Sequence, residues 1–134
     1  QVAEVSVDKT TGRITVHKII CAVDCGSVIN PNTVVAQMES GIIMGLSAAL
    51  KEKMEFAGGG VRTANFGDYD ILRMSETPEI DVHIVTSRDS LGGIGEPGVP
   101  PAAPAVANAV FAATGARLRS LPMTPAAVKA AMKA

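Results

Sequence analysis

A glycine-rich loop that contains a single carboxylate constrains this chain more than any other feature. The loop reads Ser-Leu-Gly-Gly-Ile-Gly-Glu-Pro-Gly over residues 90–98, after a strand-like segment and before a helix that opens with prolines. Ordering so many glycines costs backbone entropy, and a chain accepts that cost where something bulky must approach the main chain closely. Glu96, the carboxylate of this loop, is therefore the first candidate for a chemical role.

Length and composition restrict the class of protein. The 134 residues suffice for one domain with a sizeable core, and 47% of them are hydrophobic. The net charge of −1 gives no electrostatic basis for binding nucleic acid or an anionic membrane. Residues 34–50 come nearest to a membrane span, but this run is short and contains Gln37, Glu39 and Ser40, so we predict a buried helix. Because the chain enters a strand pattern directly at Gln1, we expect it to be a piece of a longer polypeptide.

The first part of the chain predicts a hairpin followed by a long helix. Residues 3–7 alternate between apolar and polar side chains, and a turn-forming segment joins them to a longer strand that starts at Ile14. Asn30 and Pro31 suit the N-cap and the first position of a helix that we expect to run to about Leu50.

Cys21 and Cys25 lie four residues apart in a segment of strand character. Residues at that spacing on one strand are too far apart for a disulfide, and two thiols without a second ligand pair do not make a metal site. We therefore predict that both pack as buried thiols.

One face of the long helix carries Gln37, Gly41 and Gly45, each one turn from the next. Because this face offers almost no side chains, a backbone or a ligand could lie close against it. Tight packing of another helix would explain the two glycines as well. Gln37 favours the first interpretation, since a buried amide requires hydrogen-bond partners.

The second part of the chain predicts another hairpin, a strand and two helices. Residues 51–56 and 61–66 flank a Gly-rich turn, and residues 80–86 form a strand that leads to the glycine loop. Prolines at the start of the next helix fit its first turn, and its apolar composition up to Thr114 predicts burial nearly all round. Thr124 caps a short final helix. We predict an α+β fold of antiparallel hairpins or a mixed sheet, with the two main helices packed on one side.

Three stretches, taken in order, resemble the C-terminal part of the molybdopterin-binding subunit of the xanthine oxidase family of molybdenum hydroxylases. They are residues 24–31 (Asp-Cys-Gly-Ser-Val-Ile-Asn-Pro), residues 37–41 (Gln-Met-Glu-Ser-Gly) and residues 93–97 (Gly-Ile-Gly-Glu-Pro). The resemblance is strongest to the isoquinoline 1-oxidoreductase beta subunits and related bacterial aldehyde oxidoreductases. One departure is Ser40, which stands where the family usually has a glycine.

The resemblance implies that residues 1–134 are the C-terminal fragment of a larger molybdopterin-binding catalytic domain. The whole enzyme would oxidise aldehydes or N-heterocyclic aromatics, which are small-molecule substrates, with oxygen derived from water. Molybdopterin with molybdenum, in its cytosine dinucleotide form, would be bound by the full-length protein and absent from this fragment. Electrons would leave to a partner subunit that carries 2Fe-2S clusters.

The same resemblance implies roles for five residues. Glu96 would act as the general base, and Gln37 would lie near the cofactor. Gly93, Ile94 and Gly95 would form the loop backbone that passes beside the cofactor, and no residue is expected to bind the metal directly.

A second hypothesis is a non-catalytic structural or assembly module that retains the fold without cofactor. Ser40 and the lack of the family's upstream cofactor-binding segments favour it, whereas the retained Glu96 favours an enzyme. In either case we expect the fragment to be inactive alone and to self-associate through apolar surface that its missing neighbours would cover.

Overall fold

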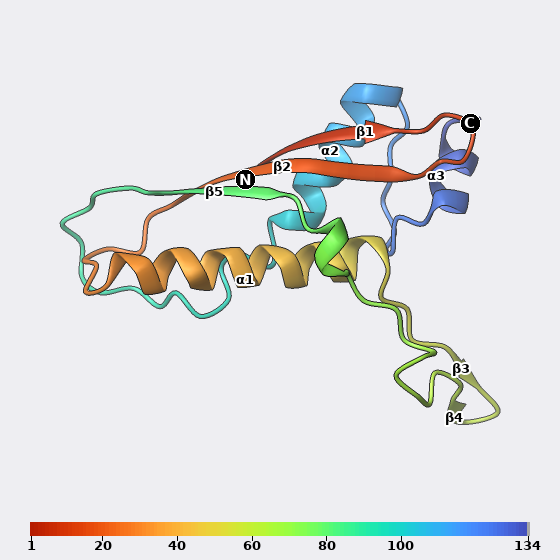
Figure 1. Ribbon diagram of the computed structural model, residues 1–134, viewed down its shortest axis with the longest axis horizontal. Coiled ribbons are helices and arrows are strands. Elements are labelled where there is room, and N and C mark those ends of the chain that lie inside the picture. The colour runs from red at the N-terminus through yellow and green to blue at the C-terminus, as the bar shows by residue number, and fades with distance from the viewer. Residues whose placement is uncertain (134) are drawn as a thin grey trace.

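A three-stranded mixed sheet forms the centre of the molecule, in the strand order β1–β2–β5 (Figure 1). β1 (Val2–Val7) and β2 (Ile14–Val23) are antiparallel, and β5 (Glu79–Ile84) is parallel to β2. The computed structural model describes residues 1–133, so Ala134, the last residue of the predicted domain, lies outside the described residues. The mixed sheet and its helices confirm the predicted α+β class.

Three α-helices and one short 3-10 helix accompany the described strands. They are α1 (Pro31–Leu50), η1 (Met74–Glu76), α2 (Ala102–Thr114) and α3 (Pro125–Ala131). The side chain of Asn30 accepts a hydrogen bond from the Thr33 N–H at 3.2 Å, which confirms the predicted start of α1. Thr124 caps α3 in the same way, by accepting from the Ala127 N–H.

The core lies between one face of the sheet and the two long helices. Val16, Ile19, Cys21 and Val23 of β2 are buried in one cluster together with apolar residues of α1 and α2. The other face of β2 is exposed, including His17. α2 contacts β1 and α1 contacts β5, so the two main helices cover one side of the sheet, as predicted. Both cysteines are free and buried, as the spacing predicted.

α1 is the one helix among residues 1–133 that is long and apolar enough to cross a membrane. Its apolar face, however, packs against the sheet, where Ile42 and Leu46 are fully buried. We therefore assign it as the core helix that the sequence predicted, since a buried core helix satisfies the same length and hydropathy test.

Two predictions about the second part of the chain are too high: the burial of α2 and the length of the strands in the second hairpin. α2 is buried on one face only, at Ala102, Val106 and Val110, because its outer face has no neighbour within residues 1–133. The second hairpin exists, but β3 (Phe56–Ala57) and β4 (Gly60–Val61) have two residues each. Its strands are exposed on both faces, so no core extends them, and the hairpin projects away from the sheet (Figure 1).

Candidate cofactor-binding site

The glycine loop lies along α1, against the face that carries Gly41 and Gly45 (Figure 1). A Cβ added to Gly41 would lie 3.2 Å from the Cα of Gly98, and one added to Gly45 would lie 2.6 Å from the carbonyl oxygen of Val99. The two glycines therefore leave space beside α1 that the backbone of Gly98 and Val99 fills. Both alternatives that the sequence left open occur: the loop backbone lies against Gly41, and Gly45 also faces the start of α2, where its added Cβ would lie 2.8 Å from the Cβ of Ala102.

Gln37 joins α1 to the middle of the loop. Its Nε2 donates a hydrogen bond to the carbonyl oxygen of Gly95 at 2.5 Å. The amide is exposed in this chain, so the expectation that it would be buried is wrong. The loop backbone supplies its partner at the edge of the molecule, and burial is not needed for that contact.

The start of the loop is fastened to the junction between β2 and α1. The N–H of Gly92 donates to the carbonyl oxygen of Cys25 at 2.9 Å, and both the N–H and the hydroxyl of Ser27 donate to the carbonyl oxygen of Asp89. Gly26 has φ +72°, and a Cβ there would lie 2.0 Å from the carbonyl oxygen of Ser90. The fold thus brings the three separate sequence stretches into one assembly.

Glu96 occupies the first position of a turn at the outer end of the loop. The N–H of Val99 donates to the carbonyl oxygen of Glu96 at 3.0 Å, which closes the turn around Pro97. The Glu96 side chain is exposed, and among residues 1–133 it has no hydrogen-bond or ion-pair partner. The backbone of this residue is held while its carboxylate remains free.

The three remaining predicted residues are Gly93, Ile94 and Gly95, and they alternate between exposed and half-buried along the loop. Ile94 is half-buried and packs against the core. Gly93 and Gly95 are exposed, and a Cβ at either position would meet nothing within 4 Å. The open space beside both glycines and the free carboxylate of Glu96 fit the close approach of a large cofactor. Among residues 1–133 no cluster of three or more metal-ligating side chains is present.

Sequence reasoning missed Gln1 as part of this site. Its Nε2 donates to the carbonyl oxygen of Gly98 at 2.9 Å, across 97 residues of sequence. No periodicity or motif marks Gln1, because the contact exists only once β1 and the loop are folded together.

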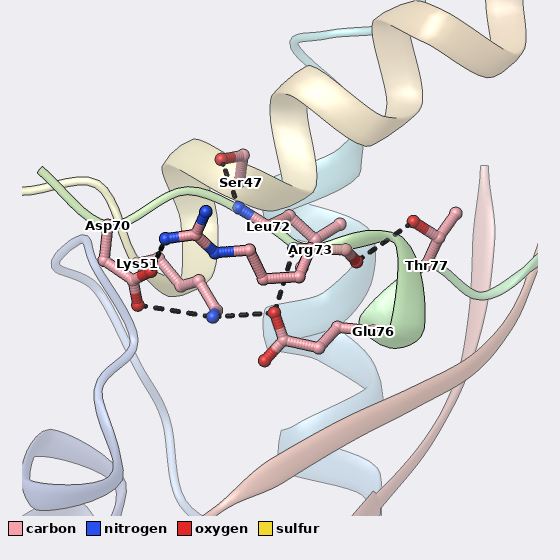
Figure 2. Close-up of polar contacts among 7 residues, drawn as sticks. All are labelled: Ser47, Lys51, Asp70, Leu72, Arg73, Glu76 and Thr77. Atoms are coloured by element: carbon pink, nitrogen blue, oxygen red, sulfur yellow. Dashed lines mark hydrogen bonds and ion pairs between the residues drawn. The ribbon is translucent and has the colours of Figure 1, made fainter. Parts of the chain in front are cut away.

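A cavity of about 640 Å³ lies at the other end of α1 and contains none of the predicted site residues. Leu46, Leu50, Leu72 and Met123 supply apolar surface to its lining. Three of the residues that line this cavity also belong to a charged cluster that we define as Lys51, Asp70, Arg73 and Glu76 (Figure 2).

The charges of this cluster neutralise one another. The Nζ of Lys51 lies 2.7 Å from Glu76 Oε2 and 3.3 Å from Asp70 Oδ2, and Arg73 lies 3.3 Å from Asp70 Oδ1 (Figure 2). The hydrogen bond from Lys51 holds the pKa of the Glu76 carboxyl below its ordinary value, and the same lysine lowers the pKa of Asp70. Glu76 in turn raises the pKa of Lys51. These pairs join Asp70 and Glu76 to Lys51, the residue that caps the C-terminal end of α1.

Comparison with known proteins identifies close relatives. Residues 1–78 match the model of the molybdopterin cofactor-binding domain. The chain is 45% identical over 125 residues to the isoquinoline 1-oxidoreductase subunit beta of Brevundimonas diminuta, a match that covers 93% of this chain and 16% of the relative. It is 41% identical over 127 residues to the membrane-bound aldehyde dehydrogenase [pyrroloquinoline-quinone] of Gluconacetobacter polyoxogenes, covering 95% of this chain and 16% of that protein.

Solved structures show the same fold. The crystal structure of quinoline 2-oxidoreductase from Pseudomonas putida 86 superposes with a TM-score of 0.89 at 26% identity, and the match covers 98% of this chain and 18% of that one. The chain thus spans about a sixth of the length of the curated relatives it matches.

Proposed function

The chain belongs to the molybdopterin cofactor-binding domains of the xanthine oxidase and aldehyde oxidoreductase family, and from this premise we propose that it forms part of a molybdenum hydroxylase subunit. The proposed reaction oxidises an aldehyde or an N-heterocyclic aromatic with oxygen derived from water. The names of the relatives, which include isoquinoline, quinoline and aldehyde enzymes, support this substrate class.

In this proposal the open edge of the loop holds the cofactor. Gly93 and Gly95 leave space for a large group, and Ile94 anchors the loop to the core between them. The amide nitrogen of Gln37 is engaged by Gly95, which leaves its carbonyl oxygen as a hydrogen-bond acceptor for the cofactor. The molybdenum–pterin group, in its cytosine dinucleotide form, supplies the two-electron oxidation of the substrate when it is bound.

Glu96 is the proposed general base. A base must come within hydrogen-bond reach of the proton that it removes, and the carboxylate of Glu96 lies free beside the open edge. It would accept the proton of the water-derived nucleophile as that oxygen attacks an electron-poor carbon of the substrate. The contact between Gln37 and Gly95 carries this proposal, because it joins two distant motifs at the residue that precedes Glu96.

The proposal also includes the partners of the whole protein. We propose that the electrons leave to a partner subunit that carries 2Fe-2S clusters, as the family resemblance implies, and the names of relatives that are single subunits of larger enzymes support this. The chain alone exposes large apolar side chains, including Phe66 at 98% and Met74 at 95%, which supports the expectation that the isolated fragment self-associates. We also propose that the fragment is inactive alone, because it spans about a sixth of the length of its relatives.

The first experiment measures the cofactor content of the full-length subunit, purified with its partner from a host able to make molybdopterin. Near-stoichiometric molybdenum and pterin would support the hydroxylase. Absence of both would favour the non-catalytic module. Pyrroloquinoline quinone should be assayed in the same sample, because one relative carries it in its name.

The role of Glu96 is tested by Glu96→Gln in the same loaded subunit. Loss of a general base lowers turnover by about 10²- to 10⁴-fold, and the molybdenum content should stay unchanged. The matched control is Glu4→Gln, which alters an exposed carboxylate on β1 outside the site. Near-normal turnover of the Glu96 variant would remove this residue from the mechanism.

A further inference from the structure

Two amide side chains hold the loop on either side of Glu96. Gln37, from α1, donates to the carbonyl oxygen of Gly95, and Gln1, next to β1, donates to the carbonyl oxygen of Gly98 at 2.9 Å. Gly98 is buried and packs against α1, where a Cβ on it would lie 2.9 Å from the carbonyl oxygen of Met38. The turn that starts at Glu96 is therefore fixed from two different elements.

The orientation of the Gln1 amide is set by this contact. Its Oε1 is buried and has no hydrogen-bond partner within residues 1–133. Reversing the amide would turn Oε1 toward the carbonyl oxygen of Gly98, which has no proton to donate.

We propose that Gln1 is a positioning residue for Glu96, an inference that rests on the proposed function of Glu96 as the base. The turn is closed by the hydrogen bond from Val99 to Glu96, and Gly98 carries the peptide group next to that bond. Holding the Gly98 carbonyl fixes the plane of the turn and so the direction in which the Glu96 side chain leaves the backbone. Without Gln1, the Gly98 carbonyl would lose its side-chain donor, and the turn would be held after Glu96 by the packing of Gly98 against α1 alone.

The test uses Gln1→Met in the full-length, cofactor-loaded subunit. Methionine has a similar length but no N–H donor, so the turn should loosen. We expect kcat to fall about tenfold, since small displacements of a reacting group are costly, with KM within about twofold and molybdenum content unchanged. Hydrogen exchange at the Val99 amide should become faster. Glu4→Gln, on the neighbouring strand, should change none of these values.

A second variant, Gln1→Glu, distinguishes positioning from general damage. An ionised carboxylate repels the Gly98 carbonyl, whereas a protonated one has an O–H that donates to it. Turnover relative to the wild type should therefore recover as the pH is lowered, which a purely structural defect would not do. This variant also decides the question if Gln1→Met fails to accumulate or loses its cofactor.

The outcomes separate this inference from the proposed function. Wild-type kcat and unchanged Val99 exchange in the Gln1 variants, beside a large loss in Glu96→Gln, would overturn the role of Gln1 alone. Normal turnover in Glu96→Gln would instead overturn the base, and the positioning role with it.

Discussion

The two ends of α1 each fasten an irregular segment, but they do so with different chemistry. Near its N-terminus the glycine loop is held by backbone packing at Gly41 and by the amides of Gln37 and Gln1. At its C-terminus residues 67–78 are held by the charged cluster around Lys51 (Figure 2). The contacts at the N-terminal end use no charged side chain, whereas those at the C-terminal end depend on charged side chains.

This difference has a consequence for function. In the charged cluster every ionised group is paired, so none is available for proton transfer. In the loop the one charged side chain, Glu96, has no partner within residues 1–133 because neutral groups do the fastening. Neutral contacts also respond weakly to salt and pH, whereas exposed ion pairs are screened and titrate. A general base benefits from support by neutral contacts, because they leave its carboxylate unpaired.

The largest expected effect comes from Gly26→Ala at the loop anchor. Its φ of +72° is unfavourable for alanine, and the new Cβ would lie 2.0 Å from the carbonyl oxygen of Ser90. We expect the local opening free energy of the loop to fall by at least about 2 kcal/mol, measured by hydrogen exchange at the Gly92 amide.

Gly58→Ala is the matched control for this prediction. It shares the positive φ, at +60°, but its Cβ would meet nothing within 4 Å. This substitution should lower the local opening free energy by about 1 kcal/mol, and the effect should be confined to the β3–β4 hairpin. Equal losses at the two positions would mean that backbone strain alone, and not the packing of the loop, explains Gly26.

A smaller effect is expected for Lys51→Met in the charged cluster. The variant removes the cation that both Glu76 and Asp70 contact, and these are partly exposed pairs, so we expect a loss of about 1 kcal/mol. The measurement is hydrogen exchange at the Leu72 amide, which donates to the Ser47 hydroxyl at 3.0 Å.

Lys53→Met provides the comparison, since the pair of Lys53 with Glu55 is more exposed and should contribute less to stability than the pairs of Lys51. Exchange at the Val99 amide should not respond to either lysine variant. Faster exchange at Val99 would show that the two ends of α1 are coupled and would break the comparison.

The smallest effect is the dependence of the charged cluster on pH. The pKa values of Glu76 and Asp70 lie below their ordinary values of 4.5 and 3.8, chiefly because Lys51 donates to both. Their contribution to stability is therefore present above pH 4.5 and is lost as the pH falls through the lowered values. We expect protection at Leu72 to decrease slightly below that pH, while protection at Val99 stays nearly constant. Parallel loss at both amides would contradict the assignment of charge to one end only.

The sequence was sufficient for features that depend on neighbouring residues. Asn30 and Pro31 specify the start of α1, and Thr124 specifies the start of α3, because capping is a contact within three residues. The spacing of Gln37, Gly41 and Gly45 also indicated a face with few side chains, but left open whether a backbone, a ligand or a helix packs against it. By contrast, the burial of α2 was overestimated, since the apolar composition of a helix does not say how many of its sides meet a neighbour.

By itself, then, the sequence determined the helices, the bare face of α1 and the choice of Glu96 as the candidate base. The tertiary structure decided what occupies that face and what holds the loop. The contacts of Gln37 with Gly95 and of Gln1 with Gly98 span 58 and 97 residues, so no local pattern encodes them. They arise because the sheet and α1 pack on a shared core, which brings an amide from each region to the same short turn.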